Sequence, residues 1–157
     1  MAEKAEVPGK LVVRVINLKY HYSAHKKRLS SAAVTPSSDN NGLSVFDASC
    51  ARRTSGSVCS HLERYYPTII GEPPCFWEFD VADYFPEGHV EPTESGVIPP
   101  DPCHQEIFGY RSSDKKSLRA VAAKIPITDL NRCDSGRAMA LNAHDLDEYA
   151  KAGLTGT

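Results

Sequence analysis

The amino-acid sequence predicts a single α+β domain with a mixed or mainly antiparallel sheet, two or three short helices and long loops rich in proline and glycine. Short segments of β-branched and aromatic residues recur along the chain, and two segments place apolar residues at helical spacing. The 11 prolines and 10 glycines interrupt them frequently. The length of 157 residues fits one domain, whose core buries roughly two thirds of the unfolded chain's surface.

We expect the chain to divide into three regions. Residues 1–10 are polar and include the Pro8-Gly9 pair, which predicts a flexible tail. Residues 11–130 hold the clearest strand and helix patterns and are predicted to form the α+β domain. Residues 131–157 are predicted to be a C-terminal extension that carries a short helix at 145–150.

The segment 11–16 reads Leu-Val-Val-Arg-Val-Ile and predicts a strand buried on both faces. Arg14 interrupts this run as a single charge. A guanidinium there must reach solvent or bind a carboxylate, a carbonyl or a ligand anion, because burying it unpaired is costly. An exposed edge position or an internal pair is the structural interpretation, and anion binding is the functional one.

The stretch 28–47 combines two strand-compatible segments with a turn-forming insert. Segments 31–34 and 43–46 are compatible with β structure, which predicts a hairpin or a pair of strands. The insert between them contains a proline and an Asn-Gly pair, which favour a turn. Ser44 then lies between apolar neighbours on the second strand, so its hydroxyl needs a hydrogen-bond partner.

The remaining patterns predict, in order, a helix at 55–66, a strand at 75–81, a long surface loop at 82–96, a strand at 105–108 and a helix at 114–124. Both helices have apolar residues at helical spacing behind serines that can cap their first turn. The strand at 75–81 alternates apolar or aromatic residues with acidic ones. We therefore expect Trp77, Phe79 and Val81 to face the core.

Charge and composition limit the classes of function. The formal net charge is -2 and the pI is about 6.3, so nucleic-acid binding is not expected. The basic cluster 25–28 is interpreted as a solvated loop, with contact to phosphate or an acidic partner as the alternative. The polar start lacks the apolar core of a signal peptide, and no apolar run is long enough for a membrane helix. We expect a cytoplasmic protein without membrane association.

Five cysteines are scattered without a CxxC pair, and without a secretory signal we expect reduced thiols. His61-Leu62-Glu63 has the His-x-Glu spacing of zinc deaminases, but the cysteine pair of that motif is absent. Other groups that could hold zinc are the pair His21 and His25 and the set Cys59, His61, Cys103 and His104. Their spacing is not diagnostic, and no metal site is expected.

The order of three residue types resembles that of ADP-ribosyl-transferring domains, which use Arg, Ser and Glu. Arg14 lies on the first strand, Ser30 and Ser31 follow, and Glu106 lies on a late strand. The resemblance implies that Arg14 holds dinucleotide phosphates, that the serines shape a nicotinamide pocket and that Glu106 stabilises a ribosyl cation. The family's Glu-x-Glu or Gln-x-Glu spacing is absent, because Gln105 directly precedes Glu106.

Four short motifs follow one another: R-V-I-N at 14–17, S-S-A-A at 30–33, G-L-S-V at 42–45 and D-P-C-H-Q-E-I-F-G at 101–109. Over roughly residues 11–125 they resemble a family of short, uncharacterised bacterial proteins with Arg-x-Ile-Asn-Pro, Ser-x-Ala-Phe, Leu-Ser-Val and Asp-Pro with a downstream His. Leu18 replaces the family's proline, and Val34 stands near its phenylalanine. The resemblance implies one fold unit and points to these residues: Arg14, Ser31, Ser44 and His104.

Two hypotheses for function follow. The first is a small recognition module of a bacterial accessory or defence-type system, acting through a protein partner. The alternative is a nucleotide- or NAD-processing enzyme of the ADP-ribosyl-transfer type, with NAD or a nucleotide as ligand and no resident cofactor expected. Homo-oligomer formation stays open under both. The candidate catalytic residues are Arg14, Ser44, His104 and Glu106, and the candidate ligand-binding residues are Arg14, Ser31 and Tyr22.

Overall fold

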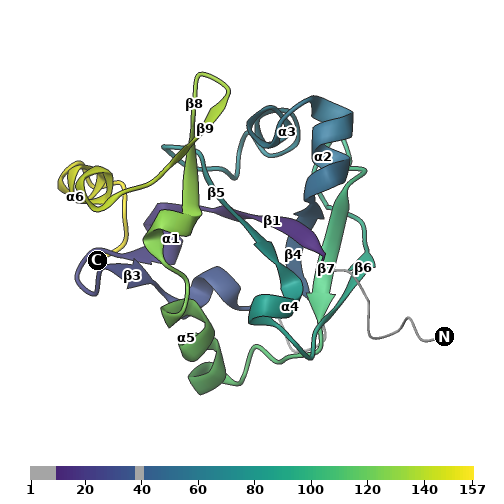
Figure 1. Ribbon diagram of the computed structural model, residues 1–157, viewed down its shortest axis with the longest axis horizontal. Helices are drawn as coiled ribbons and strands as arrows, with labels where there is room; N and C mark the ends of the chain where they lie inside the picture. Colours follow the sequence, from purple (N-terminus) through teal and green to yellow (C-terminus); the bar gives the residue numbers. More distant parts are fainter. Residues whose placement is uncertain (1–9, 38–40) are drawn as a thin grey trace.

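The computed structural model describes residues 10–37 and 41–157, so most of the predicted tail lies outside the described residues. The chain forms one α+β domain (Figure 1). Its strands are β1 (Leu11–Ile16), β2 (Tyr22–Ser23), β3 (Arg28–Leu29), β4 (Leu43–Asp47), β5 (Cys75–Asp80), β6 (His89–Pro92), β7 (His104–Phe108), β8 (Leu130–Asp134) and β9 (Arg137–Ala140). Its helices are α1 (Leu18–His21), α2 (Ala48–Ser55), α3 (Val58–Tyr65), α4 (Val81–Tyr84), α5 (Lys115–Ala123) and α6 (Ala143–Lys151), with 3₁₀ helices η2 (Ser31–Val34) and η3 (Ile127–Asp129).

A seven-stranded sheet forms the centre of the domain, with the strand order β6-β7-β4-β1-β5-β8-β9. Every neighbouring pair in this sheet is antiparallel. A separate ribbon joins β2 and β3. The predicted α+β class with a mainly antiparallel sheet is confirmed, and the described residues contain six α-helices where two or three were expected.

The C-terminal region adds two strands to this sheet. β8 pairs with β5, and β9 pairs with β8, so part of the region predicted as an extension belongs to the sheet. Helix α6 follows, at the left in Figure 1, and includes the helix predicted at 145–150. In the described part of the chain, no helix has the length and apolar character needed to cross a bilayer.

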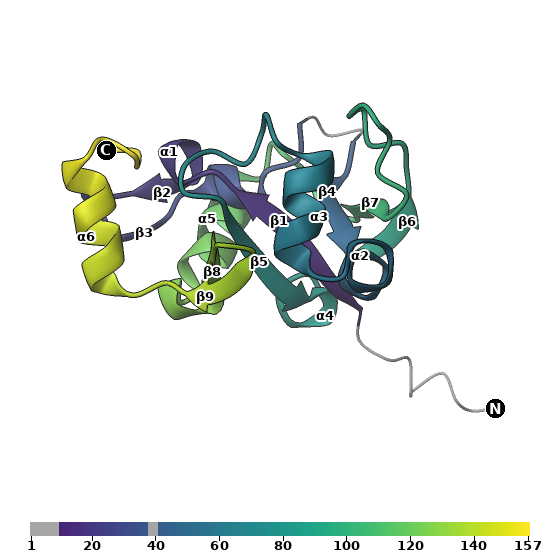
Figure 2. The same cartoon turned by 90° about the horizontal axis from the view of Figure 1, so that it is seen from above.

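Helices cover both faces of the sheet (Figures 1 and 2). α2 and α3 lie side by side on one face, where they pack against Val13, Phe46 and Phe76. The other face presents Trp77 and packs against Leu118 of α5. This arrangement follows from the alternation of side chains along each strand. The burial of the three apolar residues predicted to face the core is confirmed for Trp77, Phe79 and Val81.

β1 and β4 separate after only two paired positions, Val12 with Asp47 and Val13 with Phe46. In contrast, β1 and β5 stay paired over all six residues of β1. From residue 14 onward, β1 therefore has no ladder partner on its β4 side within the described residues. We call the opening between residues 14–16 of β1 and residues 43–45 of β4 the β1–β4 fork.

Residues 31–34 form the 3₁₀ helix η2, so the strand predicted there is wrong. The amide of Ala33 donates a hydrogen bond to the carbonyl of Ser30, and Ala33 and Val34 are fully buried in the core that includes α5. Packing against a helix has overridden the local β preference. β4 consequently pairs with β1 and β7 and forms no hairpin with residues 31–34.

The other predicted elements occur at or near their expected positions. The strands expected at 11–16, 75–81 and 105–108 are β1, β5 and β7. Ser57 caps α3 as predicted, because its hydroxyl accepts from the Ser60 amide. α5 is capped by Asp114, directly after the serines expected there. The predicted loop 82–96 contains the end of α4 and the strand β6.

Two disulfides tie the α2–α3 layer to the sheet. Cys50 of α2 bonds Cys103, directly before β7, and Cys59 of α3 bonds Cys133 of β8. The expectation of reduced thiols is wrong for these four cysteines. The partners lie 53 and 74 residues apart along the chain, so local spacing carried no signal. Cys75 of β5 is a free, buried thiol, and burial raises its pKa to about 12.

The segment before β6 approaches the end of β7 closely at Gly109, and a substitution there tests this packing. Its φ is +110°, and a Cβ there would lie 2.7 Å from the Glu87 carbonyl oxygen. Gly136 also has a positive φ, +81°, but open space around it. We expect Gly109→Ala to lower the free energy of unfolding by about 2–4 kcal/mol and Gly136→Ala by about 1 kcal/mol in urea denaturation. Equal losses would contradict this packing.

Candidate functional site

A cavity of about 500 Å³ lies at the β1–β4 fork. β1 and β4 line it from the sheet, and α1, segment 66–69 and segment 95–97 complete its walls. Its polar lining residues are Arg14, Asn17, His21, Ser44, Thr68 and Ser95, and its aromatic ones are Tyr20, Phe46 and Tyr66. A cavity of this size with a few convergent polar groups is typical of small-molecule sites.

Arg14 fills the fork between the two strands. Its Nε donates a hydrogen bond to the Ala33 carbonyl at 3.0 Å, and its Nη1 donates one to the Ser44 carbonyl at 3.1 Å. Burial lowers the pKa of Arg14 to about 10, so the guanidinium keeps its charge at neutral pH. No carboxylate in the described residues forms an ion pair with it. A cation with carbonyl partners and no acidic partner suits an anionic ligand.

Ser44 and His104 form a hydrogen-bonded pair at the edge of this cavity. Ser44 Oγ lies 2.7 Å from His104 Nε2, and His104 Nδ1 lies 3.1 Å from the Thr93 carbonyl oxygen and 2.9 Å from Thr93 Oγ1. A carbonyl can only accept, so its bond places the imidazole proton on Nδ1. Nε2 then accepts from the Ser44 hydroxyl. The sequence predicted that the Ser44 hydroxyl, between apolar neighbours, needs a hydrogen-bond partner, and His104 is that partner, although Ser44 itself is exposed.

This pair can do acid–base chemistry. His104 Nε2 is placed to take the Ser44 proton, and the Thr93 carbonyl favours the imidazole tautomer that permits this transfer. Glu106 lies directly opposite Ser44 in the β4–β7 ladder. Cross-strand partners project from the same face of a sheet, so the Glu106 side chain leaves β7 on the face that also carries Ser44.

His21 contributes a further ring to the cavity. Its Nδ1 accepts a hydrogen bond from the Asn17 amide at 3.0 Å, which leaves its proton on Nε2. Burial, and to a lesser degree the Arg14 charge, lowers the pKa of His21 to about 4. Neutral His21 therefore offers one N–H donor in this cavity. From the sequence, His21 was a candidate metal ligand or partner of a nucleophilic cysteine; its place in this cavity was not predicted, because the one-turn helix α1 that Asn17 caps was not predicted.

The structure brings together part of the predicted site. Arg14 and Ser44 line the same cavity, and His104 lies behind Ser44 with about 4% of its surface exposed. Ser31 does not line this cavity; it lines a separate hollow of about 150 Å³ with basic residues of the 26–28 turn and α5. Tyr22 is buried in the core. Arg14, Ser31 and Tyr22 therefore do not line one cavity, and a ligand-binding role for Ser31 or Tyr22 stays a prediction.

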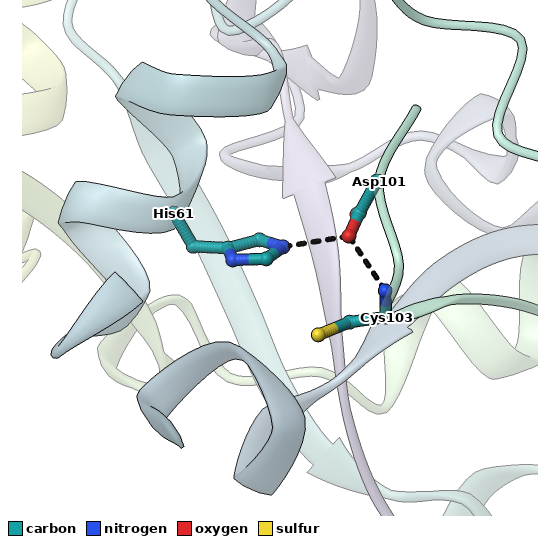
Figure 3. Close-up of side chains that lie close together, drawn as sticks. All are labelled: His61, Asp101 and Cys103. Atoms are coloured by element: carbon teal, nitrogen blue, oxygen red, sulfur yellow. Dashed lines mark hydrogen bonds and ion pairs between the residues drawn. The ribbon is translucent and has the colours of Figure 1, made fainter. Parts of the chain in front are cut away.

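A second polar cluster is buried beside the cavity, where α3 faces the segment before β7. His61 Nε2 lies 2.9 Å from Asp101 Oδ1, and the Cys103 amide donates to the same oxygen at 2.8 Å (Figure 3). Tyr66 donates its hydroxyl proton to the other carboxylate oxygen. Burial alone would raise the pKa of Asp101, but the bonds from His61, Tyr66 and the Cys103 amide hold it below its usual value. The sequence had singled out His61 and Cys103 but not Asp101.

The pKa of His21 predicts how stability depends on pH. The unfolded chain takes up a proton on His21 near pH 6.5, whereas the folded chain does so only near pH 4, so acid favours unfolding across this window. We expect the free energy of unfolding to fall by up to about 3 kcal/mol over it. Urea titrations should show the drop in the wild type and in the exposed control His25→Gln, but not in His21→Gln. A drop of equal size in His21→Gln would contradict the assignment.

Comparison with known proteins adds no family to these observations. No protein-family profile matches the chain, and no curated protein or solved structure is significantly similar to it.

Proposed function

We propose that the protein is an enzyme that processes a small phosphate-bearing substrate of the nucleotide or NAD type at the β1–β4 fork. The observation that carries this proposal is the Ser44–His104 hydrogen bond, set beside a guanidinium that has carbonyl partners and no acidic one in the described chain. A hydroxyl with a base and a fixed cation at one cavity is the minimum that such chemistry requires.

The substrate class follows from the lining of the cavity. Arg14 binds a phosphate oxygen with the N–H groups that its carbonyl partners leave over, and the neutral His21 adds a second donor. Tyr20, which is 72% exposed, supplies a ring surface against which a base or nicotinamide ring packs. The volume of about 500 Å³ suits a mononucleotide or part of a dinucleotide.

The reaction uses Ser44 as nucleophile and His104 as base. As Ser44 Oγ bonds to the electrophilic centre of the substrate, its proton moves to His104 Nε2, and the imidazolium keeps its Nδ1–H on the Thr93 carbonyl. His104 then gives this proton to the leaving group. Glu106, opposite Ser44, supplies the negative charge that stabilises the imidazolium or a ribosyl cation.

A second candidate is the recognition module that acts through a protein partner. It is favoured by exposed apolar side chains near the same cavity: Tyr20 is 72% exposed, Ile69 45% and Ile98 95%. Tyr20 and Ile69 line the cavity, and Ile98 follows the lining residue Val97 along the chain. Exposed apolar side chains around a cavity can pack against an apolar anchor residue that a partner protein inserts there.

Nucleotide and NAD turnover tests the enzyme. The purified chain is screened with NAD, mononucleotides and dinucleotides by thermal shift and by chromatography of products. We expect Ser44→Ala to reduce turnover about 10²–10⁴-fold, because the nucleophile is lost, and Arg14→Gln to weaken substrate binding about 10–100-fold. Ser31 lines the separate hollow, so the matched control Ser31→Ala should leave turnover and substrate binding unchanged.

Two outcomes would overturn the enzyme proposal. One is the absence of any thermal shift or product with all phosphate-bearing compounds. The other is turnover that persists in Ser44→Ala. If, in the first case, a peptide or protein binds the wild type but not a Tyr20→Ala and Ile98→Ser double variant, the recognition module takes its place.

A further inference from the structure

The buried cluster of His61, Asp101 and Cys103 beside the cavity contains three side chains that can each bind a metal ion. His61, Asp101 and Cys103 each offer one ligand atom, these three atoms lie within 4.8 Å of one another, and all three residues are buried (Figure 3). Cys103 is bonded to Cys50 of α2, so a second sulfur reaches the same place. Breaking that disulfide would leave two thiols, an imidazole and a carboxylate around one point.

This donor set matches what zinc prefers. Zinc binds cysteine, histidine and aspartate side chains in four-coordinate tetrahedral sites. Its ligand bonds of about 2.0–2.3 Å place neighbouring ligand atoms about 3.3–3.8 Å apart. In the structure the ligand atoms of His61, Asp101 and Cys103 lie within 4.8 Å of one another, and Cys103 Sγ is free to move toward the other two once it no longer bonds Cys50.

Ser55, Tyr66 and the Cys103 amide form hydrogen bonds to the side chains that would bind the metal. Ser55 Oγ lies 2.8 Å from His61 Nδ1, so it can accept from Nδ1–H when Nε2 binds a metal. Tyr66 and the Cys103 amide hold the Asp101 carboxylate, with Tyr66 on Oδ2 and Oδ1 turned toward His61. Such outer partners orient the ligands and fix the tautomer of a ligating histidine.

We propose that reduction of the Cys50–Cys103 disulfide converts this cluster into a zinc site formed by Cys50, Cys103, His61 and Asp101. A dithiol or phosphine reductant supplies two electrons, and with two protons the disulfide becomes two thiols. Zinc binding then releases both thiol protons, while the His61 proton moves from Nε2 to Nδ1, and the Nδ1–H donates a hydrogen bond to Ser55 Oγ. The ion joins α2, α3 and the segment before β7, so it takes over the link that the disulfide provides.

The alternative role of this cluster, a purely structural network, makes a different prediction. In that case the network needs no metal, and reduction simply removes a cross-link. The second disulfide, Cys59–Cys133, serves as an internal control, because its cysteines belong to no metal-ligating group found in the described residues.

Cobalt(II) and zinc titrations of the full chain test the proposal. The protein is reduced with a phosphine, freed of metal and titrated with Co²⁺, whose thiolate charge-transfer band reports cysteine ligation, and then with Zn²⁺ against a chromophoric chelator. We expect one ion per reduced chain, displacement of cobalt by zinc, and protection of Cys50 and Cys103 from alkylation. The oxidised protein should show no thiolate band.

The variants sharpen the result. Cys103→Ser and His61→Gln should weaken zinc binding by about 100-fold or more, and Tyr66→Phe by about 10-fold. Cys59→Ser should bind zinc as the reduced wild type does. If reduction unfolds the metal-free chain, recovery of its circular dichroism on adding zinc supports the site. Two results would overturn the proposal. One is a reduced chain that shows no thiolate band, whether it stays folded or fails to refold with zinc. The other is zinc binding by Cys103→Ser that equals that of the reduced wild type.

Discussion

The site depends on the two hydrogen bonds from the Arg14 guanidinium to the main chain. Where β1 leaves β4, ladder bonds between the strands end, and the Ser44 carbonyl has no ladder partner on β1. Arg14 replaces the missing strand partner for that carbonyl and also bonds the Ala33 carbonyl. A charged side chain of β1 therefore bridges the fork to β4 and η2, and the same side chain gives the cavity its positive charge.

The packing on either side keeps this arrangement in place. η2, which provides the Ala33 carbonyl, packs in the core that includes α5, while α2 and α3 cover the opposite face and are tied to the sheet by two disulfides. The Cys50–Cys103 disulfide lies directly before His104, the partner of Ser44. The proposed catalytic pair and the proposed zinc cluster thus share one short segment, and a change in the cross-link reaches both.

Local patterns in the sequence predicted the elements but not their partners. Apolar and aromatic runs identified β1, β5 and β7, and helical spacing identified α3 and α5. Arg14 and Ser44 were singled out because each is a polar residue within an apolar strand and needs a hydrogen-bond partner. The identity of that partner could not be predicted from the sequence. The fork and the disulfides arise from residues far apart along the chain, and the Thr93 contact to His104 depends on the pairing of β6 with β7. The 3₁₀ form of 31–34 depends on its packing in the core, which no local pattern encodes.

The most direct test is to observe the Arg14 guanidinium itself by NMR during titration with a mononucleotide and with pyrophosphate. Its Nε–H is bonded to the Ala33 carbonyl, so the account predicts a side-chain signal protected from exchange with water that shifts as the anion binds, and that is absent in Arg14→Gln. An Arg14 signal that exchanges rapidly, or that stays fixed while those of the exposed Arg28 and Arg119 shift, would contradict the claim that this guanidinium both holds the fork and binds the ligand.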